Sequence, residues 1–176
     1  MLWKRYRENS ITKEELCIQR FHLPLLHYGI DDIDLCQNLS DDYVLISPRI
    51  VQLIPHAIEV LEYLQTKYAL HIITNGFQET QDTKMKTADM LRYFTSITVS
   101  EEAGVKKPDK GIFSYALAKA NAKPEESLMI GDEMEVDIIG ARNAGIDQVF
   151  YNRKQEKHLE DTTFEISSLA ELKDLL

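Results

Sequence analysis

Four short groups of polar residues in the second half of the sequence have the types needed to handle a phosphate group beside a metal ion. They are Thr74-Asn75-Gly76, Lys107, Asp132 and Asp137. A threonine hydroxyl and the N–H groups of a turn can donate to phosphoryl oxygens, and a lysine can offset negative charge on a transferred group. The two aspartates are hard oxygen ligands of the kind that Mg²⁺ prefers. The sequence therefore predicts a site for phosphate and Mg²⁺.

The pattern that places these groups begins near residue 50, where short apolar runs start to alternate with helical segments. The runs at 70–73, 96–100, 127–130, 148–151 and 164–166 predict strands, and the segments at 55–64, 81–94, 108–120, 136–144 and 168–175 predict helices. Such alternation predicts a Rossmann-like α/β fold, with a parallel sheet covered by helices on both faces. Each polar group follows a predicted strand, where functional residues of such sheets gather.

Each group also has a simpler explanation when it is taken alone. Thr74-Asn75-Gly76 has the composition of a turn, and Lys107 could be a solvated loop lysine. Asp132 could cap a helix whose first turn carries Glu133 and Glu135. Three groups, namely Thr74-Asn75-Gly76, Lys107, and Asp132 with Asp137, occur in order, each after a predicted strand, and this order favours the functional interpretation.

Residues 1–50 are helical in pattern and contain no strand that we would predict. Thr12 and Glu15 have the spacing of a capping box, which predicts a helix that Pro24 breaks or kinks. A second helix is expected to begin at Asp31 or Asp32 and to break at Ser40-Asp41. The sequence thus predicts two domains, a helical region at 1–50 and an α/β region at 51–176.

Composition excludes several classes of protein. There are 29 acidic and 20 basic residues, and the net charge of −9 argues against binding to a nucleic-acid backbone. No apolar run is long enough to cross a bilayer and the first residues are charged, so we expect no membrane association and a cytoplasmic location. Cys17 and Cys36 are too few for a disulfide framework or a metal site and are expected to be reduced and partly buried.

Three segments of the chain resemble motifs of the haloacid dehalogenase-like hydrolases. They are Ile72–Gly76, Gly104–Phe113 and Met129–Ile146, which resemble the second, third and fourth motifs. Residues 1–50 resemble the helical cap of the subgroup similar to pyrimidine 5′-nucleotidases, through the segments Arg5-Tyr6, Ile11–Leu16 and Gln19–Phe21. The resemblance covers nearly the whole chain.

The resemblance implies a role for each of the polar groups. Asp132 and Asp137 correspond to the family's Mg²⁺ ligands. Thr74 and Lys107 correspond to its catalytic phosphoryl-binding residues, and Asn75 and Gly76 complete the substrate-binding turn. Lys106 is a weaker match than Lys107, because the family places its lysine directly before the proline.

The sequence departs from the family at the first motif, a strand ending in Asp-x-Asp-x-Thr whose first Asp is the nucleophile. Asp32-Ile33-Asp34 is a superficial match that is better explained by helix capping. In the family this strand lies centrally, so the predicted sheet lacks its central strand and leaves two apolar strand edges facing a gap. Edges of this kind favour self-association as a homo-oligomer. The two halves of the sheet could close on each other, a partner chain could fill the gap, or the sequence could be a stretch of a longer protein, and we favour the third expectation.

The leading functional hypothesis is a Mg²⁺-dependent phosphatase of small phosphomonoesters, with nucleoside 5′-monophosphates as the first candidates. The 176-residue chain is expected to be inactive or nearly so, because it lacks the nucleophile. One alternative is a non-catalytic domain or regulator that binds phosphate and Mg²⁺. A weaker alternative is haloacid dehalogenation, which uses the same nucleophile without the metal. The partner predicted by the leading hypothesis is a small-molecule phosphomonoester.

Overall fold

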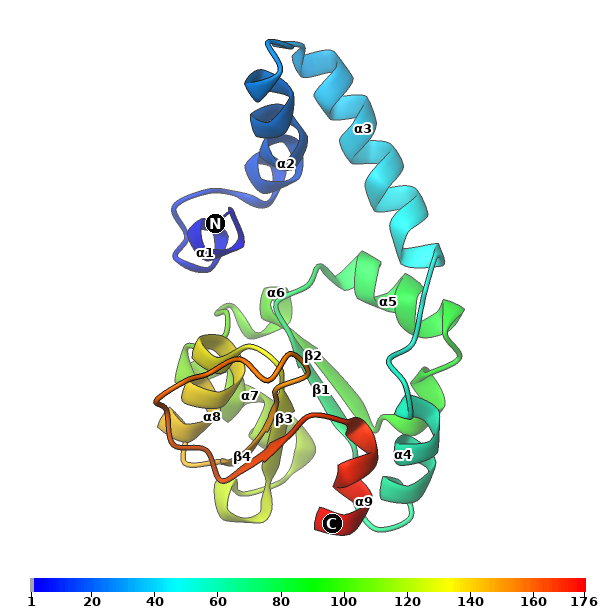
Figure 1. Ribbon diagram of the computed structural model, residues 1–176, viewed down its shortest axis with the longest axis vertical. Coiled ribbons are helices and arrows are strands. Elements are labelled where there is room, and N and C mark those ends of the chain that lie inside the picture. Colours follow the sequence, from blue (N-terminus) through cyan, green and yellow to red (C-terminus); the bar gives the residue numbers. More distant parts are fainter. Residues whose placement is uncertain (1) are drawn as a thin grey trace. The chain divides into compact units, whose positions relative to one another are not determined.

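The computed structural model describes residues 2–176, which form two compact units (Figure 1). Unit 1 comprises the residues up to Val51 together with Glu79–Thr87, and unit 2 comprises Gln52–Gln78 and Ala88–Leu176. No helix among the described residues combines the length and the apolar character needed to span a membrane.

Unit 1 is entirely helical. Its helices are α1 (Leu2–Arg7), α2 (Lys13–His27), α3 (Ile33–Ile46) and most of α5 (Gln78–Thr87), with a short 3₁₀ turn at Ser47–Arg49. The capping box at Thr12 and Glu15 is confirmed, since the Thr12 hydroxyl accepts from the Glu15 N–H and the Glu15 carboxylate accepts from the Thr12 N–H. An ion pair of 2.8 Å between Lys13 and Glu79 joins α2 to α5.

Two expected helix breaks are absent. α2 continues past Pro24 to His27, so a break there is wrong while a kink stays a prediction, and α3 passes through Ser40 without a break. Ser40 is buried, so its place in the packing of the helix outweighs the turn preference of the Ser-Asp pair. The capping explanation of Asp32 is confirmed, since its carboxylate accepts from the Leu35 N–H at 2.9 Å.

Unit 2 has the expected alternation of strands and helices. Its strands are β1 (His71–Thr74), β2 (Ser96–Val99), β3 (Leu128–Gly131), β4 (Asp147–Tyr151) and β5 (Phe164–Ile166). Its helices are α4 (Ala57–Leu64), α6 (Ser100–Ala103), α7 (Lys110–Ala120), α8 (Ile139–Asn143) and α9 (Leu172–Leu175). Short 3₁₀ turns lie at Leu91–Tyr93, Pro124–Glu126 and Leu169–Glu171, and a π-helical turn lies at Met134–Ile138. The helix expected over 81–94 is instead α5 followed by the turn at Leu91–Tyr93.

The strands form two parallel sheets rather than one. One has the order β1-β2 with Thr74 opposite Val99, and the other has the order β3-β4-β5 with Gly131 opposite Phe150. None of the described strands joins β1 to β3, and this is the place that the family resemblance gives to the first-motif strand.

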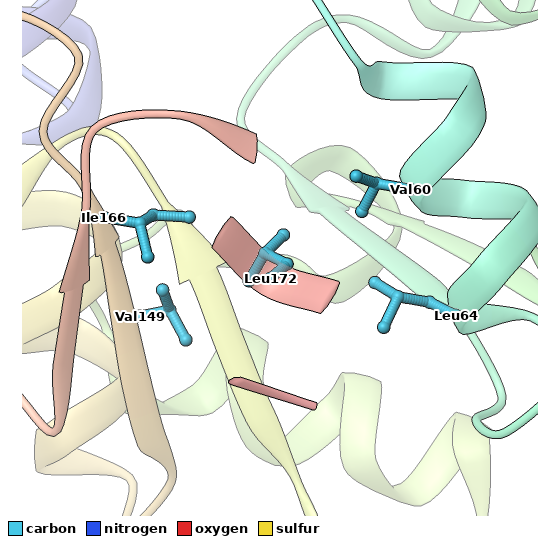
Figure 2. Packing of buried hydrophobic residues seen from close by; sticks show 5 residues of the cluster. All are labelled: Val60, Leu64, Val149, Ile166 and Leu172. Carbon is cyan, nitrogen blue, oxygen red and sulfur yellow. The ribbon is translucent and has the colours of Figure 1, made fainter. Parts of the chain in front are cut away.

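Two apolar clusters hold the sheets and helices of unit 2 together. The first is built from Val60, Leu64, Val149, Ile166 and Leu172, and Figure 2 shows Leu172 of α9 between the α4 residues and the strand residues. The second is built from Ile112, Phe113, Ala141 and Ile146. The clusters include partly buried side chains from β1 and β3, so helices cover both faces of the strands, as expected for a parallel α/β fold.

Candidate active site

Lys107 and Asp137 form a buried ion pair in unit 2. The Lys107 Nζ donates to Asp137 Oδ1 at 2.6 Å, and the two side chains are only 11% and 7% exposed. Lys107 lies in the loop before α7, and Asp137 lies in the π-helical turn that follows β3. Among the described residues one of the three ammonium donors is used by Asp137, so the group retains donors for an anion. Of the two lysines in this loop, Lys107 is the one that reaches Asp137.

Asn75 fixes the main chain at Lys107. Its Nδ2 donates to the Lys107 carbonyl at 2.9 Å, and its Oδ1 accepts from the Lys107 N–H at 2.8 Å. A side-chain amide offers a donor and an acceptor with the spacing of a peptide unit, so Asn75 pairs with the loop as a neighbouring strand would. The sequence marked Asn75 only as a member of the substrate-binding turn. Its contact with a residue 32 positions away requires the fold.

Thr74 ends β1 and closes its own turn. Its Oγ1 accepts from the Gly76 N–H at 3.0 Å, so this N–H is used within the turn. The Thr74 hydroxyl hydrogen remains available, since a hydroxyl both donates and accepts. The hydroxyl can therefore donate to an oxygen of a ligand, while the contribution of Gly76 to substrate binding stays a prediction.

The backbone after β3 wraps around the Asp137 carboxylate. Oδ2 accepts from the N–H groups of Asp132 and Glu133, at 3.2 and 3.1 Å. Gly131 permits this close approach, because a Cβ at that position would lie 2.3 Å from the Asp137 Cβ. A glycine is therefore needed before Asp132, because a larger residue would collide with Asp137. The Asp137 carboxylate accepts three hydrogen bonds in all, from Lys107 Nζ and from these two N–H groups.

Asp132 is exposed, and the structure does not use it as a helix cap. The cap position before the π-helical turn is Glu133 and no side-chain hydrogen bond caps the turn, so the capping explanation of Asp132 is not supported. Within residues 2–176 no group of three or more His, Cys, Asp or Glu side chains is arranged to hold a metal ion. The two aspartates still suit Mg²⁺, which is commonly held by one or two carboxylates while waters and phosphate oxygens complete its shell.

Two residues directly after β2 were missed by the sequence reasoning. Ser100 is 3% exposed, and its hydroxyl has no hydrogen-bond partner among the described residues. Glu101 accepts from the Gln78 N–H at 2.8 Å and so fixes the segment after β1. No motif pointed to either residue. Their position directly after a strand, at the same sheet edge as Thr74, is the feature of the sequence that could have identified them.

The structure therefore brings together Thr74, Asn75, Lys107, Asp132 and Asp137 at the carboxyl ends of β1 and β3. Hydrogen bonds connect Asn75 to Lys107, Lys107 to Asp137, and Asp137 to the backbone of Asp132. A parallel α/β unit with polar residues clustered after its strands is typical of α/β proteins that bind a ligand at this edge of the sheet.

Comparison with known proteins shows which family this is. A family model described as haloacid dehalogenase-like hydrolase matches residues 26–151, and the chain belongs to that family. The pyrimidine 5′-nucleotidase YjjG of Escherichia coli is 33% identical over 99% of this chain and 77% of its own length. A glyceraldehyde 3-phosphate phosphatase of Methanothermobacter thermautotrophicus is 31% identical over 69% of this chain and 58% of its own length. These relatives identify the chain as a phosphatase-type member of the family.

A solved structure agrees with the sequence matches. The putative hydrolase YfnB of Bacillus subtilis, described as bound to magnesium, superposes with a TM-score of 0.91 at 31% identity. The match covers 99% of this chain and 76% of the YfnB chain. The resemblance inferred from the sequence motifs is thus confirmed for both family and fold.

Proposed function

We propose that the site binds a small phosphomonoester together with Mg²⁺ and that its chemistry is Mg²⁺-dependent phosphate-ester hydrolysis. The observation that carries this proposal is the buried Lys107 ammonium, held by Asp137 and positioned through Asn75 at the carboxyl ends of two strands. A lysine with spare donors at this place is suited to phosphoryl oxygens.

The residues have distinct roles in this proposal. Lys107 and the Thr74 hydroxyl bind the phosphoryl group, Asn75 and Gly76 shape the substrate-binding turn, and Asp132 and Asp137 hold Mg²⁺. The metal when bound would supply positive charge to the phosphoryl oxygens. Nucleoside 5′-monophosphates are the first substrates to test, because the relative YjjG is named as a pyrimidine 5′-nucleotidase.

A second candidate is a domain that binds phosphate and Mg²⁺ without turnover. It is favoured by the absence of an Asp-x-Asp sequence after any of the five described strands, since the family's nucleophile belongs to that motif. We infer that the 176-residue chain by itself hydrolyses phosphate esters very slowly or not at all.

Binding and turnover are tested separately. Inorganic phosphate with Mg²⁺ should raise the thermal midpoint of the chain. The Asp132→Asn variant should lose this increase, whereas Asp174→Asn, at an exposed acid of α9, should keep it. If the Asp132→Asn chain responds as the unchanged chain does, the proposed metal site is wrong.

Turnover is measured with p-nitrophenyl phosphate and uridine 5′-monophosphate, with Mg²⁺ and with EDTA. Binding without turnover supports the second candidate for this chain. Hydrolysis that requires Mg²⁺ and disappears in Asp132→Asn would instead show that the chain is active and supplies a nucleophile that we have not identified.

A further inference from the structure

The loop that joins β4 to β5, residues 152–163, is attached to both strands through His158. The His158 ring is perpendicular to the ring of Phe150 in β4, with the two ring centroids 5.2 Å apart. Its Nε2 lies 3.1 Å from a carboxylate oxygen of Glu165 in β5. Phe150 and Glu165 lie opposite each other in the register of the two strands, so His158 packs on both strands at one level.

Both nitrogens of the His158 ring face oxygen atoms that accept hydrogen bonds. Nδ1 lies 3.1 Å from the main-chain carbonyl oxygen of Glu160, and a carbonyl oxygen can only accept. Hydrogen bonds from Asn152, and then from His158, hold the pKa of Glu165 below its usual value, so this acid is a carboxylate at neutral pH and also accepts only. Each ring nitrogen therefore needs a hydrogen of its own.

Only the protonated imidazole has a hydrogen on both nitrogens, because the neutral ring has one donor and one acceptor. If the ring were neutral, the lone pair of one nitrogen would face the lone pairs of an oxygen. The attraction between the ring and the Glu165 carboxylate would be lost as well. The observed contacts of His158 thus fit the charged ring.

The other charged groups near His158 are paired elsewhere or exposed. Arg142 of α8 donates to the Glu160 carboxylate at 2.8 Å and to the Asp161 carbonyl at 3.0 Å. The side chains of Asp161 and Lys157 belong to exposed residues of the loop, and β4 contributes the uncharged Phe150. Glu165 is therefore the charged group to which the His158 ring is hydrogen-bonded.

Two further anchors limit the part of the loop that depends on His158. Asn152 holds the main chain at Glu156, since its Oδ1 accepts from the Glu156 N–H and its Nδ2 donates to the Glu156 carbonyl, each at 2.9 Å. Arg142 holds the main chain at Asp161. Residues 157–160 lie between these anchors, and the contacts of His158 attach them to the strands.

We propose that His158 is a pH-dependent clasp, which fastens residues 157–160 to β4 and β5 while its ring is protonated and releases them when the ring loses its proton. Histidine is suited to this role because its charge ordinarily changes between about pH 5 and pH 8. The loop starts at the carboxyl end of β4, which lies beside the end of β3 that leads to Asp132. The clasp thus controls the order of a loop that starts at the sheet edge of the candidate site.

The test is nuclear magnetic resonance of the full chain. The ¹⁵N chemical shifts of the ring report its protonation at about pH 5, and the pH is then raised until they show a neutral ring. Order parameters of the backbone Cα–H bonds at 157–160 should be near about 0.85 with the ring protonated and fall below about 0.6 with the ring neutral. This readout needs neither substrate nor metal, so it is independent of the proposed function.

Two variants serve as controls. In His158→Gln the side chain can still form hydrogen bonds but cannot gain a charge, so the order of residues 157–160 should not change with pH. In His56→Gln the change falls on an exposed pair of α4, in which the His56 and Glu59 side chains are 47% and 55% exposed. This variant should keep the full response of the loop.

Three results would overturn the proposal. The first is equal order of residues 157–160 with the protonated and the neutral ring, whether the segment is rigid or flexible in both. The second is a pH response that persists in His158→Gln or disappears in His56→Gln, since another group then causes it. The third is a ring that is already neutral at about pH 5 while the segment is ordered.

Discussion

Breaking the Lys107–Asp137 pair should destabilise unit 2 more than breaking any exposed ion pair. The Asp137→Asn change leaves the Lys107 ammonium buried without a counter-ion, and removing one partner of a buried pair costs about 3–5 kcal/mol. The Lys107→Met change should cost less, because Asp137 keeps the N–H donors of Asp132 and Glu133. For a chain of 176 residues a loss of about 3 kcal/mol corresponds to a fall of roughly 6–12 °C in Tm.

The assay is urea denaturation followed by circular dichroism for the two single variants and the double variant. The double variant should lose less stability than the sum of the single variants, by about 1–3 kcal/mol, because neither charge is then left unpaired. If the loss of stability in the double variant equals the sum of the two single losses within about 0.5 kcal/mol, the argument that the pair is buried and coupled is refuted.

Lys119 and Glu102 provide a matched exposed pair. Their charged groups lie 2.8 Å apart, but the side chains are 32% and 37% exposed. The hydrogen bond from Lys119, and then that from Tyr115, holds the pKa of Glu102 below its usual value. The Glu102→Gln change should cost only about 0–1 kcal/mol, and added salt should reduce its effect. If Glu102→Gln lowers the free energy of unfolding as much as Asp137→Asn does, burial does not determine how much an ion pair contributes to the stability of this protein.

Three further changes test the packing around the site, each measured by urea denaturation. Gly131→Ala should cost about 1–3 kcal/mol, because the new Cβ would lie 2.6 Å from Asp137 Oδ2; an unchanged midpoint would contradict this steric argument. Asn75→Ala should cost about 1–3 kcal/mol through the loss of two hydrogen bonds to Lys107, and a neutral result would show that the loop holds its position without them. Burial lowers the pKa of His71, so its contribution to stability should be present above the ordinary histidine pKa of about 6.5 and be lost as the pH falls below it. Between about pH 7 and pH 5 the free energy of unfolding should fall less in the His71→Gln variant than in the unchanged chain. If it falls equally with pH in both, His71 is not the source of the pH dependence.

The order of strands and helices in unit 2 could be predicted because each strand is a short apolar run followed by a turn or a polar group. The same holds for the residues of the site, since parallel strands bring their carboxyl ends to one edge. The contacts among those residues could not be predicted. Asn75 and Lys107 are 32 positions apart, and no local pattern shows that an amide side chain will pair with a distant peptide unit.

One of the two errors in unit 1 has a physical cause in the structure. A proline in a helix and a Ser-Asp pair both favour a break locally, yet α2 passes through Pro24 and α3 through Ser40. Pro24 lies on an exposed part of α2, and nothing in the structure explains why the helix continues past it. In α3 the side chains of Cys36 and Ser40 are buried, so the packing of the helix outweighs the local preference there. Sequence rules for breaking helices are therefore weakest where a helix is held by its neighbours.

The charges of the site lead to a prediction about how its two ligands depend on each other. Lys107 is offset by Asp137, and Asp132 adds a further negative charge, in a chain whose net charge is −9. Phosphate alone therefore meets no net positive charge from these three residues. Mg²⁺ at Asp132 would reverse the local sign, so phosphate should bind more tightly with Mg²⁺ present.

Linkage requires that the effect be reciprocal, so phosphate must strengthen Mg²⁺ binding by the same factor. A factor of about 5–150 is typical of such coupling. Isothermal titration of each ligand with and without the other measures both factors. Equal affinities in the two conditions would mean that the phosphate and metal sites are not adjacent, and the assignment of Asp132 to the metal would then be wrong.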